Sequence, residues 1–158
     1  HVNIELKYYG HDKQLVERVA DLVDSRDMGS EVVVMSLNSG QVRRMRALKP
    51  DWKVGQVMSV SAGNLKRLPA DFLAVNASFV NRNLVRRAHK LGMDVYVWTV
   101  NDAASISKMI SRGVDALLTD EAALALAVVQ QRAEMSFPER LLLELADLFG
   151  VTPKRGEQ

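Results

Sequence analysis

This chain of 158 residues contains no cysteine, which excludes disulfide bonds, thiolate catalysis and thiolate-bound metals. It also has no apolar run near the roughly 20 residues of a membrane-spanning helix. Its length falls short of the about 250 residues that a complete (β/α)8 barrel typically takes. The sequence predicts one globular unit with an ordinary core, and it leaves the location open between the cytoplasm and a membrane surface.

Neither sign of charge dominates the chain. Its 21 Lys and Arg residues and 19 Asp and Glu residues leave a net charge of +2, which does not favour nucleic acid as a partner. We interpret the clustered basic residues as solvated helix faces, with a phosphate-rich membrane surface as the alternative partner. The two clusters are Arg43, Arg44, Arg46 and Lys49, and Arg82, Arg86, Arg87 and Lys90.

Apolar runs rich in β-branched residues predict the strands. The runs are nearly continuous, as is typical of strands that are buried on both faces of a parallel sheet. The expected strands are Val2–Lys7, Glu31–Leu37, Val54–Val60, Asp71–Asn76, Asp94–Val100 and Asp115–Leu118.

Amphipathic segments between these runs predict helices. Gly29, Gly92 and Gly113 each stand between a predicted helix and the next strand, where a positive φ is cheap only for glycine. Asn101 or Asp102 can cap the start of the fourth long helix. The expected helices are Lys13–Asp27, Ser39–Leu48, Asn83–Leu91 and Asp102–Arg112, with a short irregular helix at Gly63–Leu68.

The alternation of strands and helices implies parallel strands joined by right-handed crossovers. Two architectures fit six such units. One is an open doubly wound sheet, although the chain has no GxGxxG or GxxxxGK[ST] phosphate loop. The other is six strands of an eight-stranded barrel, with the first two absent.

The C-terminal part of the chain predicts two further helices. The first covers Glu121–Ala133, and Ser136 with Glu139 forms a capping box that opens the second, Phe137–Phe149. Leucines give the second helix an apolar stripe, which either docks on the domain or binds a partner or a membrane surface. We expect a barrel portion over residues 1–133 and a C-terminal helix and tail over residues 134–158.

Polar side chains occupy the predicted carboxyl ends of the strands, where a parallel barrel binds its ligands. Glu5 and Lys7 are two residues apart and therefore share one face of the first strand. Glutamate offers hard oxygen to Mg²⁺ or Ca²⁺, and lysine offers a point charge to a phosphate. Trp98, on the fifth strand, would wall the pocket or cover a choline-like head group by cation–π contact. These residues suggest a metal-and-phosphate pocket.

Three segments at these positions resemble, in order and spacing, successive signatures of the glycerophosphodiester phosphodiesterase family: Asn3–Lys7, Val95–Asn101 and Gly113–Asp120. The segment Ala70–Asn76 resembles the family's strand before the tryptophan strand, and the resemblance runs over about residues 2–122. It implies a TIM barrel that uses a divalent cation, Mg or Ca, to hydrolyse glycerophosphodiesters to glycerol 3-phosphate and an alcohol. We therefore predict an α/β fold that is a partial TIM (β/α)8 barrel, about six of eight βα units, plus a C-terminal helix.

The resemblance implies a role for three residues. Glu5 matches the family's metal-binding glutamate, Lys7 its phosphate-contacting lysine and Trp98 the aromatic residue of its substrate pocket. His11, in the loop after Lys7, is a further candidate for contact with the substrate. The positions that match motif residues of a more structural role are Thr99, Asn101 and Asp120.

The family's acid/base histidines and its other acidic metal ligands precede the glutamate–lysine strand, so we expect no catalytic residue within this chain. We expect a fragment that is inactive alone and that is completed by a preceding segment or by another copy of the chain. Its ligand would be a small glycerophosphodiester, and the parent protein could associate with a membrane. The alternative function is a non-catalytic module that binds phosphate or phospholipid head groups.

Overall fold

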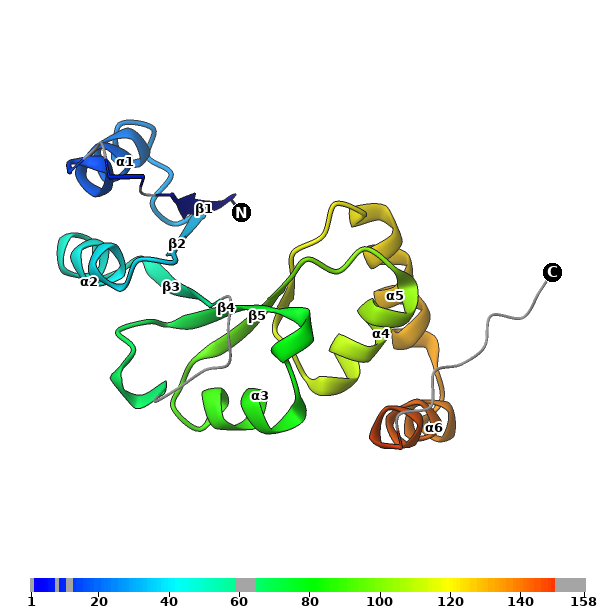
Figure 1. Ribbon diagram of the computed structural model, residues 1–158. Coiled ribbons are helices and arrows are strands. Elements are labelled where there is room, and N and C mark those ends of the chain that lie inside the picture. The colour runs from blue at the N-terminus through cyan, green and yellow to red at the C-terminus, as the bar shows by residue number, and fades with distance from the viewer. Residues whose placement is uncertain (1, 8, 11–12, 59–64, 150–158) are drawn as a thin grey trace.

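A computed structural model describes residues 2–7, 9–10, 13–58 and 65–149 of the chain. Its strands form one parallel sheet in which each strand pairs with the next in chain order (Figure 1). They are β1 (Val2–Leu6), β2 (Val32–Ser36), β3 (Lys53–Met58), β4 (Phe72–Asn76), β5 (Asp94–Trp98) and β6 (Ala116–Leu117). Each lies within its predicted range, except that β3 begins one residue early.

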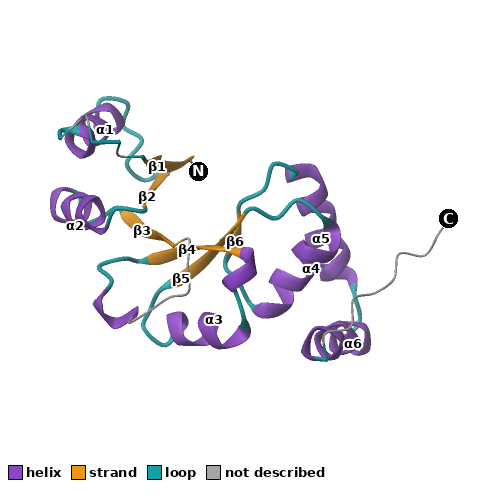
Figure 2. Cartoon of the chain, viewed as in Figure 1, coloured by secondary structure: helices purple, strands orange, loops and turns teal. Residues whose placement is uncertain are grey.

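The sheet curls, and helices cover its outer face, so that the described chain forms a partial TIM barrel (Figure 2). This confirms the predicted fold class and rules out the doubly wound alternative, since the strand order never reverses. The α-helices are α1 (Leu15–Asp24), α2 (Ser39–Leu48), α3 (Arg82–His89), α4 (Ala103–Arg112), α5 (Ala122–Glu134) and α6 (Phe137–Leu148). The short 3₁₀ helices are η1 (Leu65–Arg67) and η2 (Ala77–Phe79).

Side-chain hydrogen bonds fix where several helices begin. Asp102 accepts a hydrogen bond from the backbone N–H of Ser105 at 2.9 Å and caps α4. Before α6, one carboxylate oxygen of Glu139 accepts from both the backbone N–H and the hydroxyl of Ser136, and the bond to the backbone N–H is the glutamate half of the predicted capping box. No helix in the described part of the chain is long and apolar enough to cross a membrane.

Apolar side chains pack on both faces of the sheet. The outer face meets the helices, and buried residues such as Leu84, Val85 and Ala88 of α3 contribute to that core. The inner, concave face has a smaller cluster, in which the rings of Phe72 and Tyr96 stack with centroids 4.2 Å apart. Apolar side chains are packed on both faces of the strands, which explains why the strand sequences are nearly continuous in apolar residues.

The two end strands of the sheet are paired on one side only. Within the described residues, β1 pairs with β2, and β6 pairs with β5. A complete barrel closes on itself and leaves no such edges. The sheet therefore offers two free edges where further strands would fit.

Candidate functional site

Glu5 and Lys7 reach the inner face of the sheet because side chains alternate along β1. The intervening Leu6 is 3% exposed and packs in the core beneath α1 and α2. Lys7 Nζ lies 3.6 Å from a carboxylate oxygen of Glu5, and the two side chains are 60% and 33% exposed. This separation exceeds that of a good hydrogen bond, so both groups remain able to contact a ligand.

A cleft of about 490 Å³ brings these two residues together with Trp98 at the carboxyl ends of the strands. Apolar side chains form its floor, and polar groups from three strand ends form its rim. Its lining consists of Glu5, Lys7, Met35, Leu37, Val57, Trp98, Thr99, Leu118, Thr119 and Asp120. The sequence-predicted residues Glu5, Lys7 and Trp98 therefore share one surface, although β1 and β5 are separated by three strands in the sheet.

Trp98 is held in a fixed orientation on this surface. Its indole N–H donates a hydrogen bond of 3.0 Å to the backbone carbonyl of Ala74 on the neighbouring strand β4. The ring packs against the inner cluster of apolar residues. Because the N–H is already bonded to Ala74, the part of Trp98 that stays available for apolar or cation–π contact is its ring.

The rim opposite β1 is a network that joins the loops after β5 and β6. The Asn101 amide donates to an Asp120 carboxylate oxygen at 2.7 Å, and Asn101 Oδ1 accepts from the Thr119 hydroxyl and from the Asp120 backbone N–H. Asp120 and Thr119 both line the cleft. The motif residues Asn101 and Asp120 thus fix the shape of the rim, as a structural role requires.

A second hollow of about 560 Å³ adjoins the cleft on the side of β2 and shares Glu5 and Lys7 with it. Ser36 also lines it, but its hydroxyl is engaged within the protein, at 2.8 Å from the Leu6 carbonyl and 2.7 Å from Gln41 Oε1.

Gln56 supports the end of β2 and was not predicted from the sequence. It is 4% exposed and donates to the carbonyls of Ser36 and Leu37 at 3.0 and 2.9 Å. A glutamine within an apolar strand was the available signal for this residue.

No histidine among the described residues lines the cleft. His11 lies outside the described residues. His89 is on α3, on the outer layer, where its Nε2 lies 2.8 Å from an Asp115 carboxylate oxygen. This contact gives His89 a structural role on the outer layer, away from the cleft.

Glu5 by itself fits one position in a cation site. Its carboxylate borders the cleft, and carboxylate oxygens are the hard ligands that Mg²⁺ and Ca²⁺ prefer. In the parts of the chain that the structure describes, no three His, Asp or Glu side chains gather as a metal centre. Further ligands would have to come from elsewhere.

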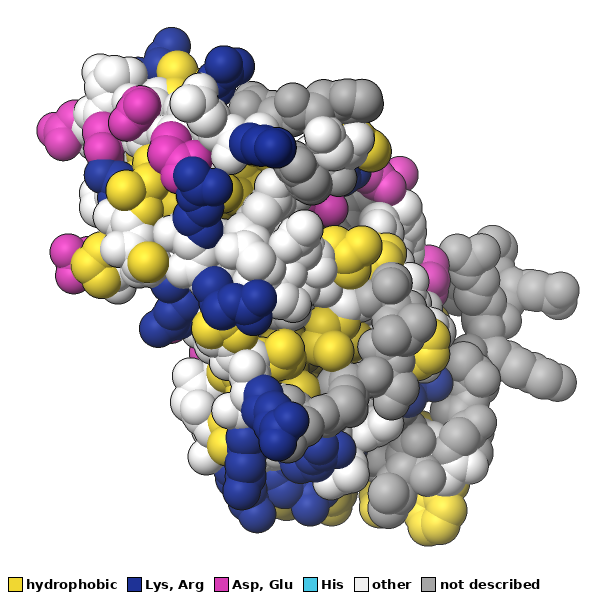
Figure 3. All heavy atoms as spheres, turned by 60° about the vertical axis from the view of Figure 1, so that its left-hand side comes forward, with side chains coloured by type: hydrophobic (Ala, Val, Ile, Leu, Met, Phe, Trp, Pro, Cys, Tyr) yellow, Lys and Arg dark blue, Asp and Glu magenta, His cyan; other side chains and the backbone are white. Residues whose placement is uncertain are grey.

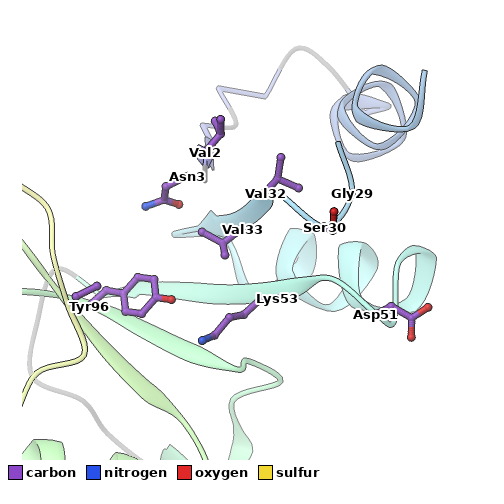
Figure 4. A pocket seen from close by; sticks show the side chains of 10 residues that line it. Val2, Asn3, Gly29, Ser30, Val32, Val33, Asp51, Lys53 and Tyr96 are labelled. Atoms are coloured by element: carbon purple, nitrogen blue, oxygen red, sulfur yellow. The ribbon is translucent and has the colours of Figure 1, made fainter. Parts of the chain in front are cut away.

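The opposite end of the half-barrel has a hollow of about 450 Å³ beside the starts of β1, β2 and β3 (Figure 4). Lys53 and Tyr96 point toward it, and the Lys53 ammonium lies 5.6 Å from the centroid of the Tyr96 ring. Lys53 also pairs with Asp94, and this hydrogen bond raises the pKa of the lysine. Since barrel proteins bind substrates at the other end, we assign this hollow to the core of the barrel.

The fold defines the chain as a partial (β/α) barrel, and the cleft lies at the carboxyl ends of its strands. The sequence model of the glycerophosphoryl diester phosphodiesterase family matches residues 1–124. The chain belongs to this family. Members generally depend on a divalent metal.

Relatives of known name agree with this assignment. The chain is 28% identical over 126 residues to YhdW of Bacillus subtilis, with 74% of the chain and 51% of YhdW covered. It is 25% identical over 130 residues to a glycerophosphodiester phosphodiesterase of Caldanaerobacter subterraneus, with 76% and 51% covered. The chain thus spans about half the length of these curated relatives.

Solved structures share the fold. A glycerophosphodiester phosphodiesterase of Parabacteroides distasonis superimposes with a TM-score of 0.74 at 24% identity, covering 84% of this chain and 58% of that one. An Oleispira antarctica phosphodiesterase in complex with the product sn-glycerol 3-phosphate gives a TM-score of 0.72 at 21% identity, with 81% and 54% covered. At these identities the likeness shows the fold alone.

Proposed function

We propose that this chain supplies the phosphate-binding half of a glycerophosphodiester phosphodiesterase site. In this proposal Lys7 binds the substrate phosphate, Trp98 walls the substrate pocket and Glu5 is one ligand of a divalent cation, Mg²⁺ or Ca²⁺. The proposal rests chiefly on one observation, the convergence of these three side chains on one cleft at the carboxyl ends of the strands. The Oleispira antarctica phosphodiesterase, whose structure holds the product sn-glycerol 3-phosphate, supports glycerol 3-phosphate as the product here as well.

Each residue has a distinct task in this proposal. Lys7, exposed and only loosely paired with Glu5, neutralises charge on the phosphate. Trp98 offers its ring to the organic part of the ligand, because its N–H is bound to Ala74. A bound cation would withdraw further charge from the phosphate as a Lewis acid.

Among the described residues we identify no general acid or general base for the proton transfers of the reaction. Hydrolysis needs a general base and a general acid within hydrogen-bond reach of the reacting atoms. His89 lies on the outer layer, and the family resemblance implies that the acid/base histidines precede β1. We infer that the 158-residue chain alone binds glycerophosphate and does not hydrolyse its diesters. A preceding segment, or a second copy, would complete the barrel at the free edges of β1 and β6.

Calorimetric titration of the chain with sn-glycerol 3-phosphate tests the role of Lys7. The Lys7→Gln variant should bind at least about tenfold more weakly, because a hydrogen bond to a charged group is worth about 1.5–3 kcal/mol. Lys108→Gln, an exposed change of the same charge on α4, is the control and should leave affinity unchanged. Equal affinities of the Lys7 and Lys108 variants would rule out the proposed phosphate contact.

A non-catalytic module that binds phosphate or phospholipid head groups is the second candidate function. It is favoured by one observation: the described residues that line the cleft include one lysine and the two carboxylates of Glu5 and Asp120, but no histidine. Glu5→Ala separates the two functions. In a module that relies on Lys7 it should leave glycerol 3-phosphate affinity nearly intact, with or without Mg²⁺. In the phosphodiesterase half-site it should remove any strengthening of binding by Mg²⁺ or Ca²⁺.

A further inference from the structure

The buried polar side chains of the described residues are gathered at one place. They are Ser36, Gln41 and Gln56, each at most 9% exposed. In contrast, Figure 3 shows Lys, Arg, Asp and Glu side chains spread over the surface on the side of the molecule that carries α1 and α2. Burying a polar side chain costs free energy that an apolar side chain would not, so a cluster of three needs a physical reason.

Strand register places this cluster directly behind the cleft. Leu6, Ser36 and Gln56 form one row across β1, β2 and β3, because Leu6 pairs with Ser36 and Ser36 pairs with Gln56. The row faces the helices, since Leu6 packs in the core beneath α1 and α2. Neighbouring residues along a strand point to opposite faces, so the residues on either side of the row face inward. Those that line the cleft are Glu5, Lys7, Met35, Leu37 and Val57.

The Ser36 hydroxyl joins the end of β1 to the start of α2. Its oxygen lies 2.8 Å from the Leu6 carbonyl and 2.7 Å from Gln41 Oε1, and it accepts a hydrogen bond of 3.1 Å from the Asn38 backbone N–H. One hydroxyl proton serves the two acceptor oxygens. The Asn38 side chain in turn caps α2 by accepting from the backbone N–H groups of Gly40 and Gln41. The hydroxyl thus holds the end of β1 against a capped helix start.

Gln56 holds the end of β2 from the side of β3. Its side-chain amide donates to the carbonyls of Ser36 and Leu37 at 3.0 and 2.9 Å. Leu37 lines both the cleft and the adjoining hollow. The end of β2 is therefore fixed between β3 and α2, and it is the support to which the Leu6 carbonyl is bound.

Lys7 depends on this support because β1 is held on one side. Within the described residues β1 pairs with β2 alone, and the register ends at Leu6 with Ser36. Lys7 lies one residue beyond that last pair. The Leu6 carbonyl and the Lys7 nitrogen belong to one planar peptide group. A hydrogen bond to this carbonyl therefore restrains the backbone from which the Lys7 side chain extends.

We propose that Ser36 is a positioning residue of the phosphate site, and that its hydroxyl serves the site by fixing the peptide between Leu6 and Lys7. This inference rests on the proposed role of Lys7 in binding phosphate. Ser36 acts through Lys7: part of the ordering that binding requires is present before the ligand arrives, which lowers its entropic cost. Gln56 contributes by holding Ser36 in place.

Calorimetric titration with sn-glycerol 3-phosphate tests the proposal. Ser36→Ala should weaken binding about fivefold, because ordering one long side chain on binding carries a cost of that size. Ser36→Thr keeps the hydroxyl and should bind within about twofold of the unmodified chain. Val34→Ala removes buried apolar atoms from the same face of β2, so it should lower stability and leave affinity unchanged. Circular dichroism verifies that each variant is folded.

A double-mutant cycle with Lys7→Gln shows whether Ser36 acts through Lys7. In the Lys7→Gln background, Ser36→Ala should have no further effect on affinity, whereas independent contributions would add. Additive losses would overturn the proposal. So would an equal loss of affinity in Val34→Ala, or failure of Ser36→Thr to keep the affinity that Ser36→Ala loses.

An NMR measurement without ligand separates this inference from the proposed function. The order parameter of the Lys7 backbone amide should fall in Ser36→Ala and not in Val34→Ala. An unchanged order parameter in Ser36→Ala would overturn the positioning role whether or not the chain binds glycerol 3-phosphate. Failure of the unmodified chain to bind it would overturn the proposed function. Lys7-dependent binding that Ser36→Ala leaves intact would overturn the positioning role alone.

Discussion

Gly55 shows how closely the inner face of the half-barrel is packed. A Cβ atom at this position would lie 2.2 Å from Cε2 of Phe72, whose ring is fully buried. We predict that Gly55→Ala destabilises the fold by about 1–3 kcal/mol, because the ring has to move within a packed cluster. Urea unfolding measures the change.

The double variant Gly55→Ala with Phe72→Leu is the matched test of this cause. Removing the ring makes room for the new methyl group, so the two changes should cost less together than the sum of their separate costs. Additive costs would show that the effect of Gly55→Ala has another origin.

Other glycines show what sequence reasoning captures and what it misses. Gly92 and Gly113 have φ values of 74° and 81°, which confirms the prediction that they end helices. Gly29 does not share that conformation. A Cβ there would approach Trp52 Nε1 to 3.0 Å, so close packing is its constraint, and Asp27 takes the positive φ of 53°. The contact between Gly29 and Trp52 joins residues far apart in the sequence, so no local sequence pattern predicts it.

The candidate site was predictable to the extent that it follows from strand alternation. Glu5 and Lys7 had to share a face, and both border the cleft with Trp98. Two hydrogen bonds could not be predicted from the sequence. The Trp98 N–H donates to the Ala74 carbonyl, and the Gln56 amide donates to the Ser36 carbonyl at the end of β2. Both depend on the register between neighbouring strands. The roles of Glu5, Lys7 and Trp98 stay predictions, and so does that of His11.

At the scale of elements, the capping box before α6 leads to a prediction about pH. Hydrogen bonds from the Ser136 hydroxyl and backbone lower the pKa of Glu139. The box therefore stabilises the helix fully above the ordinary glutamate pKa of about 4.3, and its contribution is lost as pH falls through the lowered pKa. The NMR signal of the Ser136 amide should titrate with a midpoint below about 4.3.

Glu139→Gln is the control for this titration. Its side chain keeps an acceptor oxygen but cannot ionise, so the acid transition of the Ser136 amide should disappear. A wild-type midpoint at or above about 4.3 would contradict the capping geometry.

The positions of the helices and strands followed from the pattern of apolar residues, but their packing partners did not. Helix α2 matches its predicted range, and β6 is shorter than expected, at two residues. The order of strands in the sheet came from the family resemblance, since alternating strands and helices also suit a doubly wound sheet. Apolar periodicity defines an element's buried face and leaves open which neighbour covers it. The division between residues 1–133 and 134–158 remains a proposal.

At the scale of the whole molecule, the free edges of β1 and β6 predict association. Unpaired edges present a row of backbone donors and acceptors that readily pair with another chain. Sedimentation of the 158-residue chain should reveal species larger than the 17.6 kDa monomer. A stable, fully ordered monomer across the micromolar range would contradict this expectation.

The most direct test of the half-site is an assay for turnover by the 158-residue chain. Glycerophosphocholine would be incubated with the chain and Mg²⁺ or Ca²⁺, and the release of glycerol 3-phosphate would be followed. We predict no release above that of a chain-free control, although glycerol 3-phosphate binds in the cleft. Robust metal-dependent release that Glu5→Ala abolishes would show that the chain contains a complete catalytic site, contrary to our account.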